Sequence, residues 1–301
     1  FDPPSGVLAT ANGRITPDGY SFYISDEWEA PFRTDRIYHV LQSGKKLSAA
    51  DMLALQTEVY SDYDRFCAER MVYAVDNQKN ASPRARQAAD ILRKWDGRLT
   101  MDSAAAVIET RARAEFVNAL LRPKLGELAL EYHWPMMTAF VENVLLHQPV
   151  RWLPPGADSV NAVLAQAVEK AVASTNAPGD LSRWQWGKAS PIELRHLLFG
   201  RLPLLKYFAG PGEKPQSGGR YTVKQVGRTF GPSERLTVDF ADFDRSTLNI
   251  VNGQTDNLLS EHFNDQWSAW YEGRTFVLPF SAAAVDTAKV QTLVLQPSSK
   301  R

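Results

Sequence analysis

The spacing of apolar residues changes near residue 180, and this change restricts the chain to an α+β architecture. Before that point, apolar residues recur at helical intervals between proline and glycine breaks, which predicts helices at 31–44, 47–78, 83–95, 103–121, 124–147 and 159–177. After it, RLTVDF (235–240) and RTFVLPF (274–280) have strand composition, and AGPGEKPQSGGR (209–220) is typical of a surface loop. We therefore predict an α-rich portion followed by a mixed α/β portion.

The segment at 47–78 carries the clearest helical pattern in the chain. Ser48 and Asp51 have the spacing of a capping box, in which each side chain accepts a hydrogen bond from the other residue's backbone N–H. Apolar residues follow at helical spacing and form one stripe: Met52, Leu55, Val59 and Phe66. The pattern predicts one long amphipathic helix.

The N-terminal stretch GVLATANGRITPDGY (6–20) has a different pattern. Residues 6–12 alternate weakly and predict a strand, with residues 20–24 as the candidate partner strand. The run ends in Asn12-Gly13, and Asn-Gly is a strong signal for a tight hairpin turn. As a pattern, Asn12 is therefore a turn residue.

Charge and hydropathy exclude two classes of partner. Lys+Arg and Asp+Glu number 34 each among 301 residues, so the net charge is zero. Nucleic acids and anionic membrane surfaces both attract a basic excess, and we predict neither as a partner. No run of about 18 apolar residues is present, so no membrane span is predicted.

The residues that most often carry chemistry form no recognisable catalytic set. The one cysteine, Cys67, excludes an intrachain disulfide and lies in mid-helix, where a packed thiol is expected. No zinc-hydrolase pattern joins the histidines, which are predicted to be structural: His39, His133, His147, His196 and His262. DFADFD (239–244) lacks the glycine and the final glutamate of a calcium loop. Large aromatics such as Trp184 and Trp270 favour a core or a partner interface over a ligand platform.

The chain begins FDPPSG, without an initiator methionine, a basic segment or an apolar leader. We therefore expect that it was cut from a longer polypeptide.

Five segments, taken together and in order, carry a family resemblance. They are LATANGRITPDGY, FRTDRIYHVLQSGKKLSAADMLALQTEVYS, LRKWDGRLTMDSAAAVI, FGPSERLTVDFADFD and NGQTDNLLSEHFNDQWSAWYEGRTFVLPFS. In this order they resemble the penicillin acylase family of N-terminal nucleophile hydrolases, and specifically the C-terminal part of its β subunit. The family includes N-acyl-homoserine lactone acylases, and the resemblance runs from near residue 6 to about residue 281.

The resemblance implies a fold and a way of working. The whole enzyme would have the four-layer αββα fold. Residues 1–30 would supply a core strand segment, 31–180 an α-rich region and 181–301 a mixed α/β region. Family members are exported precursors that cut themselves into α and β chains, which implies a periplasmic or secreted bacterial enzyme. The new N-terminal serine of the β chain is the nucleophile, so it would come from another polypeptide, and this chain alone would be inactive.

Two residues match functional positions of the family. Asn12, in TANGR, matches the asparagine whose side-chain amide completes the oxyanion hole. Arg36, in TDRI, matches the arginine that helps to hold the catalytic amine and this asparagine. The resemblance requires no cofactor, although a structural calcium near Asp26 occurs in some members. The segments GQTDN and SEHF depart from the family pattern at Thr255, Asp256, Glu261 and Phe263, where local structural change is expected.

The implied reaction is hydrolysis of an N-acyl amide through an acyl-enzyme. N-acyl-homoserine lactones and β-lactam amides such as penicillin G are the leading substrates, which would link the protein to quorum quenching or antibiotic resistance. The competing hypothesis is a non-catalytic scaffold or binding subunit of the same fold. The presence of both Asn12 and Arg36 favours the enzyme.

Overall fold

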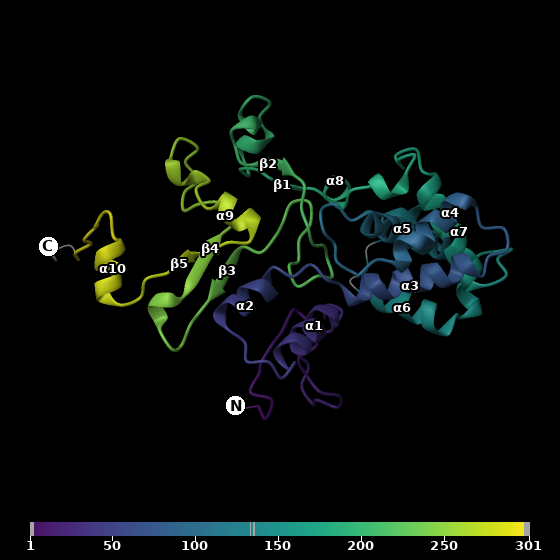
Figure 1. The fold of residues 1–301 in the computed structure, drawn as a ribbon, viewed down its shortest axis with the longest axis horizontal. Helices are drawn as coiled ribbons and strands as arrows, with labels where there is room; N and C mark the ends of the chain where they lie inside the picture. The colour runs from purple at the N-terminus through teal and green to yellow at the C-terminus, as the bar shows by residue number, and fades with distance from the viewer. Residues whose placement is uncertain (1–2, 133, 135, 298–301) are drawn as a thin grey trace. The chain divides into compact units, whose positions relative to one another are not determined.

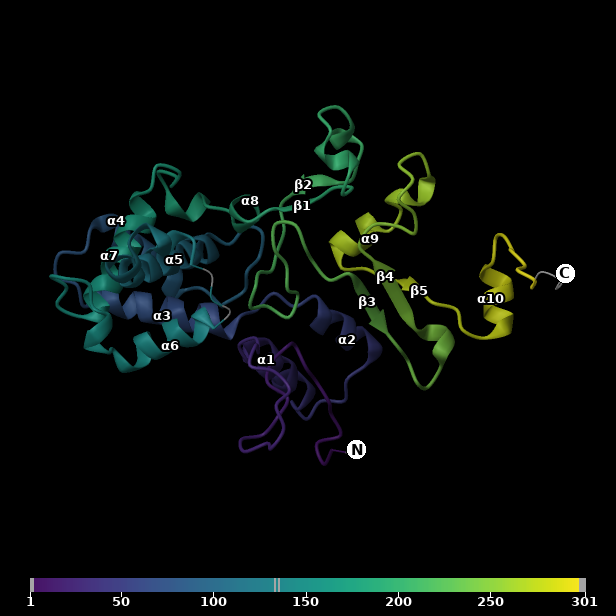
Figure 2. The ribbon, with the colours of Figure 1, turned by 180° about the vertical axis from the view of Figure 1, so that it is seen from behind.

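The structure is a computed structural model that describes residues 3–132, 134 and 136–297. The chain divides into two compact units, shown as ribbons in Figures 1 and 2. The first comprises Phe1–Lys46 and Leu55–Gly231, and the second Leu47–Ala54 and Pro232–Arg301. The division into 1–30, 31–180 and 181–301 stays a prediction about the assembled protein.

The first unit is mainly helical and is built around one long central helix. Its helices are α1 (Phe32–Leu41), α3 (Asp62–Asp76), α4 (Pro83–Arg93), α5 (Ala104–Leu125), α6 (Met137–His147), α7 (Val160–Ala173) and α8 (Trp186–Ala189). Figures 1 and 2 both show α5 among α3, α4 and α7, which it contacts. Alanines along α5 and α7 allow these helices to approach closely, and Phe116 and Leu120 of α5 are fully buried.

Serine caps begin four of these helices. The side chains accept hydrogen bonds from backbone N–H groups three residues later, at 3.1–3.2 Å, which satisfies donors that a helix leaves free. The capping serines are Ser61, Ser82, Ser103 and Ser159. The helices predicted at 31–44, 83–95, 103–121 and 159–177 are confirmed, with ends that differ by a few residues.

The single helix predicted at 47–78 is wrong, because the chain forms α2 (Ala49–Gln56), α3 and an extended link between them. The capping box at Ser48 is present: the Ser48 backbone N–H donates to the Asp51 carboxylate at 2.7 Å. The link pairs with a distant segment instead of continuing the helix. Leu99 N–H donates to Val59 O at 2.8 Å, and Ser61 N–H donates to Gly97 O at 3.0 Å.

Two further predictions need correction. The helix predicted at 124–147 is interrupted, because Gly126 ends α5 with a positive φ of +58°, which favours glycine, and α6 begins only at Met137. A short 3-10 turn, Gly126–Leu130, follows the break. The loop predicted at 209–220 contains the strand β2 (Gly212–Lys214), which pairs antiparallel with β1 (Ile192–Leu194).

The second unit contains α2 for most of its length and a three-stranded antiparallel sheet. Its strands lie in the order β3 (Glu234–Thr237), β4 (Thr247–Ile250) and β5 (Phe276–Val277), so the strands predicted at 235–240 and 274–280 are confirmed in shorter form. The helix α9 (Trp267–Glu272) contacts β4, and α10 (Ala282–Ala288) follows β5.

The core of the second unit contains an unusual cation. Trp270 is 2% exposed, and the Arg235 guanidinium lies 4.9 Å from the centre of its ring. Arg235 Nη1 donates to Trp270 O at 2.8 Å, whereas Nε and Nη2 are buried without a hydrogen-bond partner among the described residues. Burial lowers the pKa of Arg235 to about 10.

The strand predicted at 6–12, with its partner at 20–24, is wrong for the described residues, which form no strand in this region. Gly13 does not adopt the positive φ that a type I′ hairpin turn requires at both central residues. Backbone donors of this stretch bond side chains of α1 instead of a neighbouring strand.

The mixture of helices and antiparallel sheets confirms the α+β class. Within the part of the chain that the structure describes, every helix is too short or too polar to cross a membrane.

Candidate functional site

The loop around Asn12 is attached to α1 by polar contacts along one helix face. Ala9 N–H donates to Tyr38 Oη at 3.2 Å, and Ala11 N–H donates to Thr34 Oγ1 at 3.1 Å. Residues four apart on a helix point in the same direction, so Thr34 and Tyr38 act as two adjacent anchors. Gly13 lies so close that an added Cβ would come within 2.9 Å of Thr34 Oγ1. The sequence therefore fixes the loop backbone on α1.

Asn12 has an uncommon backbone conformation and a fixed side chain. Its φ is +65°, a left-handed value that asparagine tolerates better than most residues, and its carbonyl accepts a hydrogen bond from Glu29 N–H at 2.9 Å. Arg33 Nη2 donates to Asn12 Oδ1 at 2.9 Å. A guanidinium can only donate, so this contact sets the amide orientation and directs Nδ2 elsewhere.

Arg33 is buried, with 8% of its surface exposed, whereas Asn12 is exposed. Burial lowers the pKa of the Arg33 guanidinium, and the negative charge of Glu29 opposes that change. Arginine remains charged at neutral pH even so. Asn12 Nδ2 has no hydrogen-bond partner among the described residues. The Asn12 amide group is therefore a neutral donor at the protein surface, and its orientation is fixed by the hydrogen bond from Arg33 to Oδ1.

Arg36, the arginine selected from the sequence, makes a different contact. Its Nε and Nη2 donate to the two carboxylate oxygens of Glu58 at 2.9 and 2.6 Å, and its guanidinium lies 4.7 Å from the centre of the Tyr60 ring. The hydrogen bonds to Glu58 raise the pKa of Arg36. The structure thus brings Asn12 together with Arg33, while Arg36 joins α1 to the link that precedes α3.

Sequence reasoning missed Arg33, although it lies three residues before Arg36 on the same helix. Both arginines occur in FRTDR, and their spacing from Asn12 along the chain gives no preference for either. The observation that separates them is burial against the loop, which depends on how the loop crosses α1.

Surface depressions lie beside this loop. One of about 430 Å³ is lined by Gly13, Thr34, Tyr38 and neighbouring residues, but Asn12 is not among them. Several large apolar side chains around the loop are exposed: Leu8, Ile15, Phe22 and Tyr23 are 63–81% exposed. Clusters of exposed apolar side chains are typical of interaction surfaces.

The other residues considered from the sequence have structural surroundings. Cys67 is fully buried, and burial raises the pKa of its thiol well above the usual range, so it is not a reactive thiolate. His196 Nδ1 accepts hydrogen bonds from two backbone N–H groups, and His262 lies 2.9 Å from Asp265, which raises the pKa of this histidine. His133 lies outside the described residues.

Asp26, near which some family members hold a structural calcium, has a hydrogen-bond partner in this structure. Asp26 accepts a hydrogen bond from the Tyr23 hydroxyl at 3.1 Å, which occupies one side of its carboxylate. Within the described ranges, no group of three or more His, Cys, Asp or Glu side chains is placed to hold a metal ion. The structural calcium that some family members hold in this region is not tested by these residues alone.

A buried charge cluster joins α3 to α5. Arg113 donates to Asp64 at 2.8 Å through Nη2 and to Glu109 at 2.7 Å through Nε, and both carboxylates are buried. Burial raises the pKa of both acids, that of Glu109 to about 7. Because the two acids share one cation, the negative charge of Asp64 adds to the effect of burial on the pKa of Glu109.

Comparison with known proteins places this geometry in context. The family model described as penicillin amidase matches residues 1–287. The chain is 27% identical to an acyl-homoserine lactone acylase, QuiP, of Pseudomonas aeruginosa, over 95% of this chain and 39% of that protein. It is 24% identical to the penicillin acylase 2 proenzyme of Pseudomonas sp. (strain SE83), over 99% of this chain and 39% of that protein. The chain therefore spans about two fifths of the length of these relatives.

A solved structure shows the fold. A thermostable penicillin G acylase from Alcaligenes faecalis matches with a TM-score of 0.64 at 16% identity, over 99% of this chain and 58% of that one. The described chain thus has the fold of a portion of that acylase, which confirms the predicted fold class.

Proposed function

The chain belongs to the penicillin amidase family, and from this premise we propose that it is the C-terminal portion of the β chain of an acylase that hydrolyses N-acyl amides. The nucleophile in this proposal is the N-terminal serine of another polypeptide, whose own α-amine acts as base. The serine attacks the amide carbonyl, the amine leaves, and water then hydrolyses the acyl-enzyme to release the acid.

In this reaction Asn12 is the oxyanion donor. Attack on the amide carbonyl places negative charge on its oxygen, and a neutral donor held in advance stabilises that charge without altering the nearby amine base. The observation that carries the proposal is the Asn12 amide, whose Oδ1 is fixed by buried Arg33 and whose Nδ2 has no partner among the described residues.

In this proposal Arg33 contacts Asn12 directly, whereas Arg36 acts indirectly. Arg33 is the positioning residue, because its hydrogen bond to Oδ1 selects the amide orientation that presents Nδ2. Arg36 supports the site through its pair with Glu58, which holds the helix that carries Arg33, Thr34 and Tyr38.

The exposed apolar residues between Leu8 and Ile24 support an assembly with the α chain and with the β segment that bears the serine. N-acyl-homoserine lactones and β-lactam amides such as penicillin G are the proposed substrates, because relatives of both names match the chain. We propose a precursor that processes itself in the bacterial periplasm or outside the cell, with no cofactor required.

A non-catalytic scaffold of the same fold is the second candidate function. The intact mass of the purified protein separates the two, because the acylase requires a partner chain with an N-terminal serine, threonine or cysteine. Isolation of this polypeptide with no such partner would favour the scaffold.

Replacement of Asn12 in the assembled protein tests the catalytic role. Alanine would be strained at φ +65°, so the informative variants are Asn12→Gly, which tolerates that backbone, and Asn12→Asp, which keeps the contact to Arg33 but lacks the donor. Both should lower kcat for acyl amide hydrolysis by about 10²–10³-fold with little change in KM. Asn80→Ala, at an exposed asparagine between α3 and α4, is the matched control and should have the wild-type kcat.

A double-mutant cycle tests Arg33. Arg33→Met should lower kcat by itself, but it should add little to Asn12→Gly, because it acts through the amide that this variant lacks. Processing is followed by mass spectrometry and folding by thermal unfolding, so that loss of assembly is distinguished from loss of catalysis. Full activity of Asn12→Gly in a processed enzyme would show that Asn12 is only a turn residue.

A further inference from the structure

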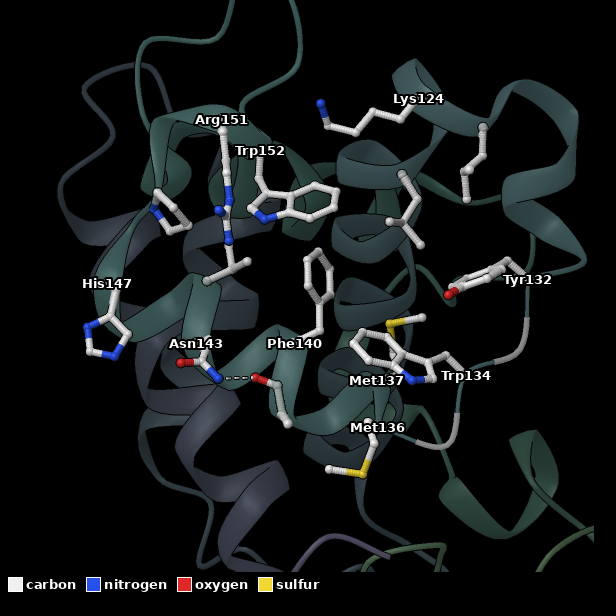
Figure 3. A pocket seen from close by; sticks show the side chains of 15 residues that line it. Lys124, Tyr132, Trp134, Met136, Met137, Phe140, Asn143, His147, Arg151 and Trp152 are labelled. Carbon is white, nitrogen blue, oxygen red and sulfur yellow. Dashed lines mark hydrogen bonds between the residues drawn. The ribbon is translucent and has the colours of Figure 1, made fainter. Parts of the chain in front are cut away.

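The first unit contains an apolar pocket of about 780 Å³ whose lining shares no residue with the Asn12 loop (Figure 3). It lies between the C-terminal turn of α5, the helix α6 and the 3-10 turn Val150–Trp152. This volume is in the range of sites that bind small molecules.

The walls of the pocket are aromatic and adaptable. Phe140 packs edge-on against Trp152 with 4.7 Å between ring centres, and Trp134 lies 6.3 Å from Phe140. Met136 and Met137 line the same space, and Figure 3 labels both next to Trp134. Unbranched thioether side chains adjust to the shape of a flexible apolar chain.

Two cations complete the lining. Lys124 Nζ lies 5.3 Å from the centre of the Trp152 ring, and Arg151 is the residue before that tryptophan. Figure 3 shows both basic side chains on the same side of the pocket as Trp152. Neither forms an ion pair with a described residue, and none of the fifteen described residues that line the pocket is acidic.

We propose that this pocket binds an aliphatic monocarboxylate, with its chain among Phe140, Trp152 and the methionines and its head group at Lys124 and Arg151. Burial of the chain supplies most of the affinity, and the two cations select an anionic head over a neutral or cationic one. The ligand class follows from the lining alone and does not depend on the proposed hydrolysis.

Isothermal titration of the assembled protein tests this selection with three probes of equal chain length: octanoate, octanol and octylammonium. Octanoate should bind most tightly and octylammonium least. Lys124→Met and Arg151→Met should each weaken octanoate about two- to fivefold, since a solvent-exposed ion pair contributes up to about 1 kcal/mol. The double variant should bind octanoate and octanol alike. Lys170→Met removes an exposed cation of α7 that does not line the pocket and should change nothing.

A substitution that fills the pocket tests whether octanoate binds there. Ala139 lines it, and Ala139→Phe should weaken octanoate at least about tenfold, whereas Ala114→Phe, at an exposed position of α5, should not. Circular dichroism confirms that both variants fold. Equal binding of octanoate and octanol by the wild-type protein, undiminished binding in Ala139→Phe, or no binding because the assembled protein covers the pocket would each overturn the proposal.

Discussion

Replacement of Glu109 with glutamine tests the charge cluster that joins α3 to α5. Asp64 and Glu109 share the single guanidinium of Arg113, so ionisation of both acids would leave one uncompensated negative charge in the helical core. Burial is the main cause that raises the pKa of Glu109 to about 7, and the neighbouring charge of Asp64 adds to it. An unfolded glutamate titrates near its ordinary value of about 4.3.

The sign of the pH dependence follows from these two values. Between the unfolded and the folded pKa the folded protein holds a proton that the unfolded chain has released. This contribution to the free energy of unfolding is therefore complete below about pH 4.3, falls as the pH rises, and is lost above about pH 7. Each pH unit within the window changes it by up to about 1.4 kcal/mol, and the whole window by on the order of 3 kcal/mol.

Glutamine keeps an acceptor for Arg113 but cannot ionise. At pH 4 the variant Glu109→Gln should nearly match the wild-type protein, because Glu109 is then largely protonated in both the folded and the unfolded state. At pH 8 the variant should be the more stable protein by on the order of 3 kcal/mol. Hydrogen exchange of α5 backbone amides reports the local free energy of opening. Wild type and variant are compared at the same pH, so that the intrinsic exchange rate cancels.

Glu115→Gln is the matched control, because Glu115 lies on the same helix, is half-buried and forms no ion pair with a described residue. The difference in the free energy of opening between Glu115→Gln and the wild-type protein should not depend on pH. A loss of stability in Glu109→Gln that grows towards pH 8 would refute the reasoning, since it would mean that the ionised glutamate stabilises the fold through Arg113.

Two further predictions concern a buried charge, Arg235, and a glycine at positive φ, Gly97. Arg235→Met keeps the bulk beside Trp270 and removes a buried charge, so it should raise the free energy of unfolding by about 1–2 kcal/mol in urea titrations, whereas Arg235→Ala should lower it. Gly97→Ala should lower it by about 2–3 kcal/mol, because φ is +83° and the added Cβ would lie 2.7 Å from Tyr60 Cε2. Gly156→Ala, at φ +80° with no atom within 4 Å of the added Cβ, should lower the free energy of unfolding clearly less. Equal losses in the two variants would show that the contact with Tyr60 does not cause the loss in Gly97→Ala.

The elements that the sequence predicts well are those that local interactions decide. Ser82 and Ser103 each cap the helix that begins at the next residue, by accepting a hydrogen bond from the N–H three residues later. The apolar spacing of the following turns identifies the buried face. The break between α2 and α3 was not predictable in this way. Val59 and Ser61 pair with backbone groups near residue 98, almost forty residues along the chain, and no window of local sequence contains that partner.

The same distinction explains the candidate site. Asn12 could be selected because its identity, in TANGR, is itself the signal, and asparagine is also among the residues that tolerate its left-handed backbone. The arginine that holds it could not be selected, because Arg33 and Arg36 differ by less than one helical turn in a helix whose pattern suits either. Which one reaches Oδ1 depends on the path of the loop over Thr34 and Tyr38, and a path of this kind is a tertiary property. The family motif therefore selects Asn12, the proposed oxyanion donor, while the arginine that bonds its side chain emerges only when the loop and α1 are placed together.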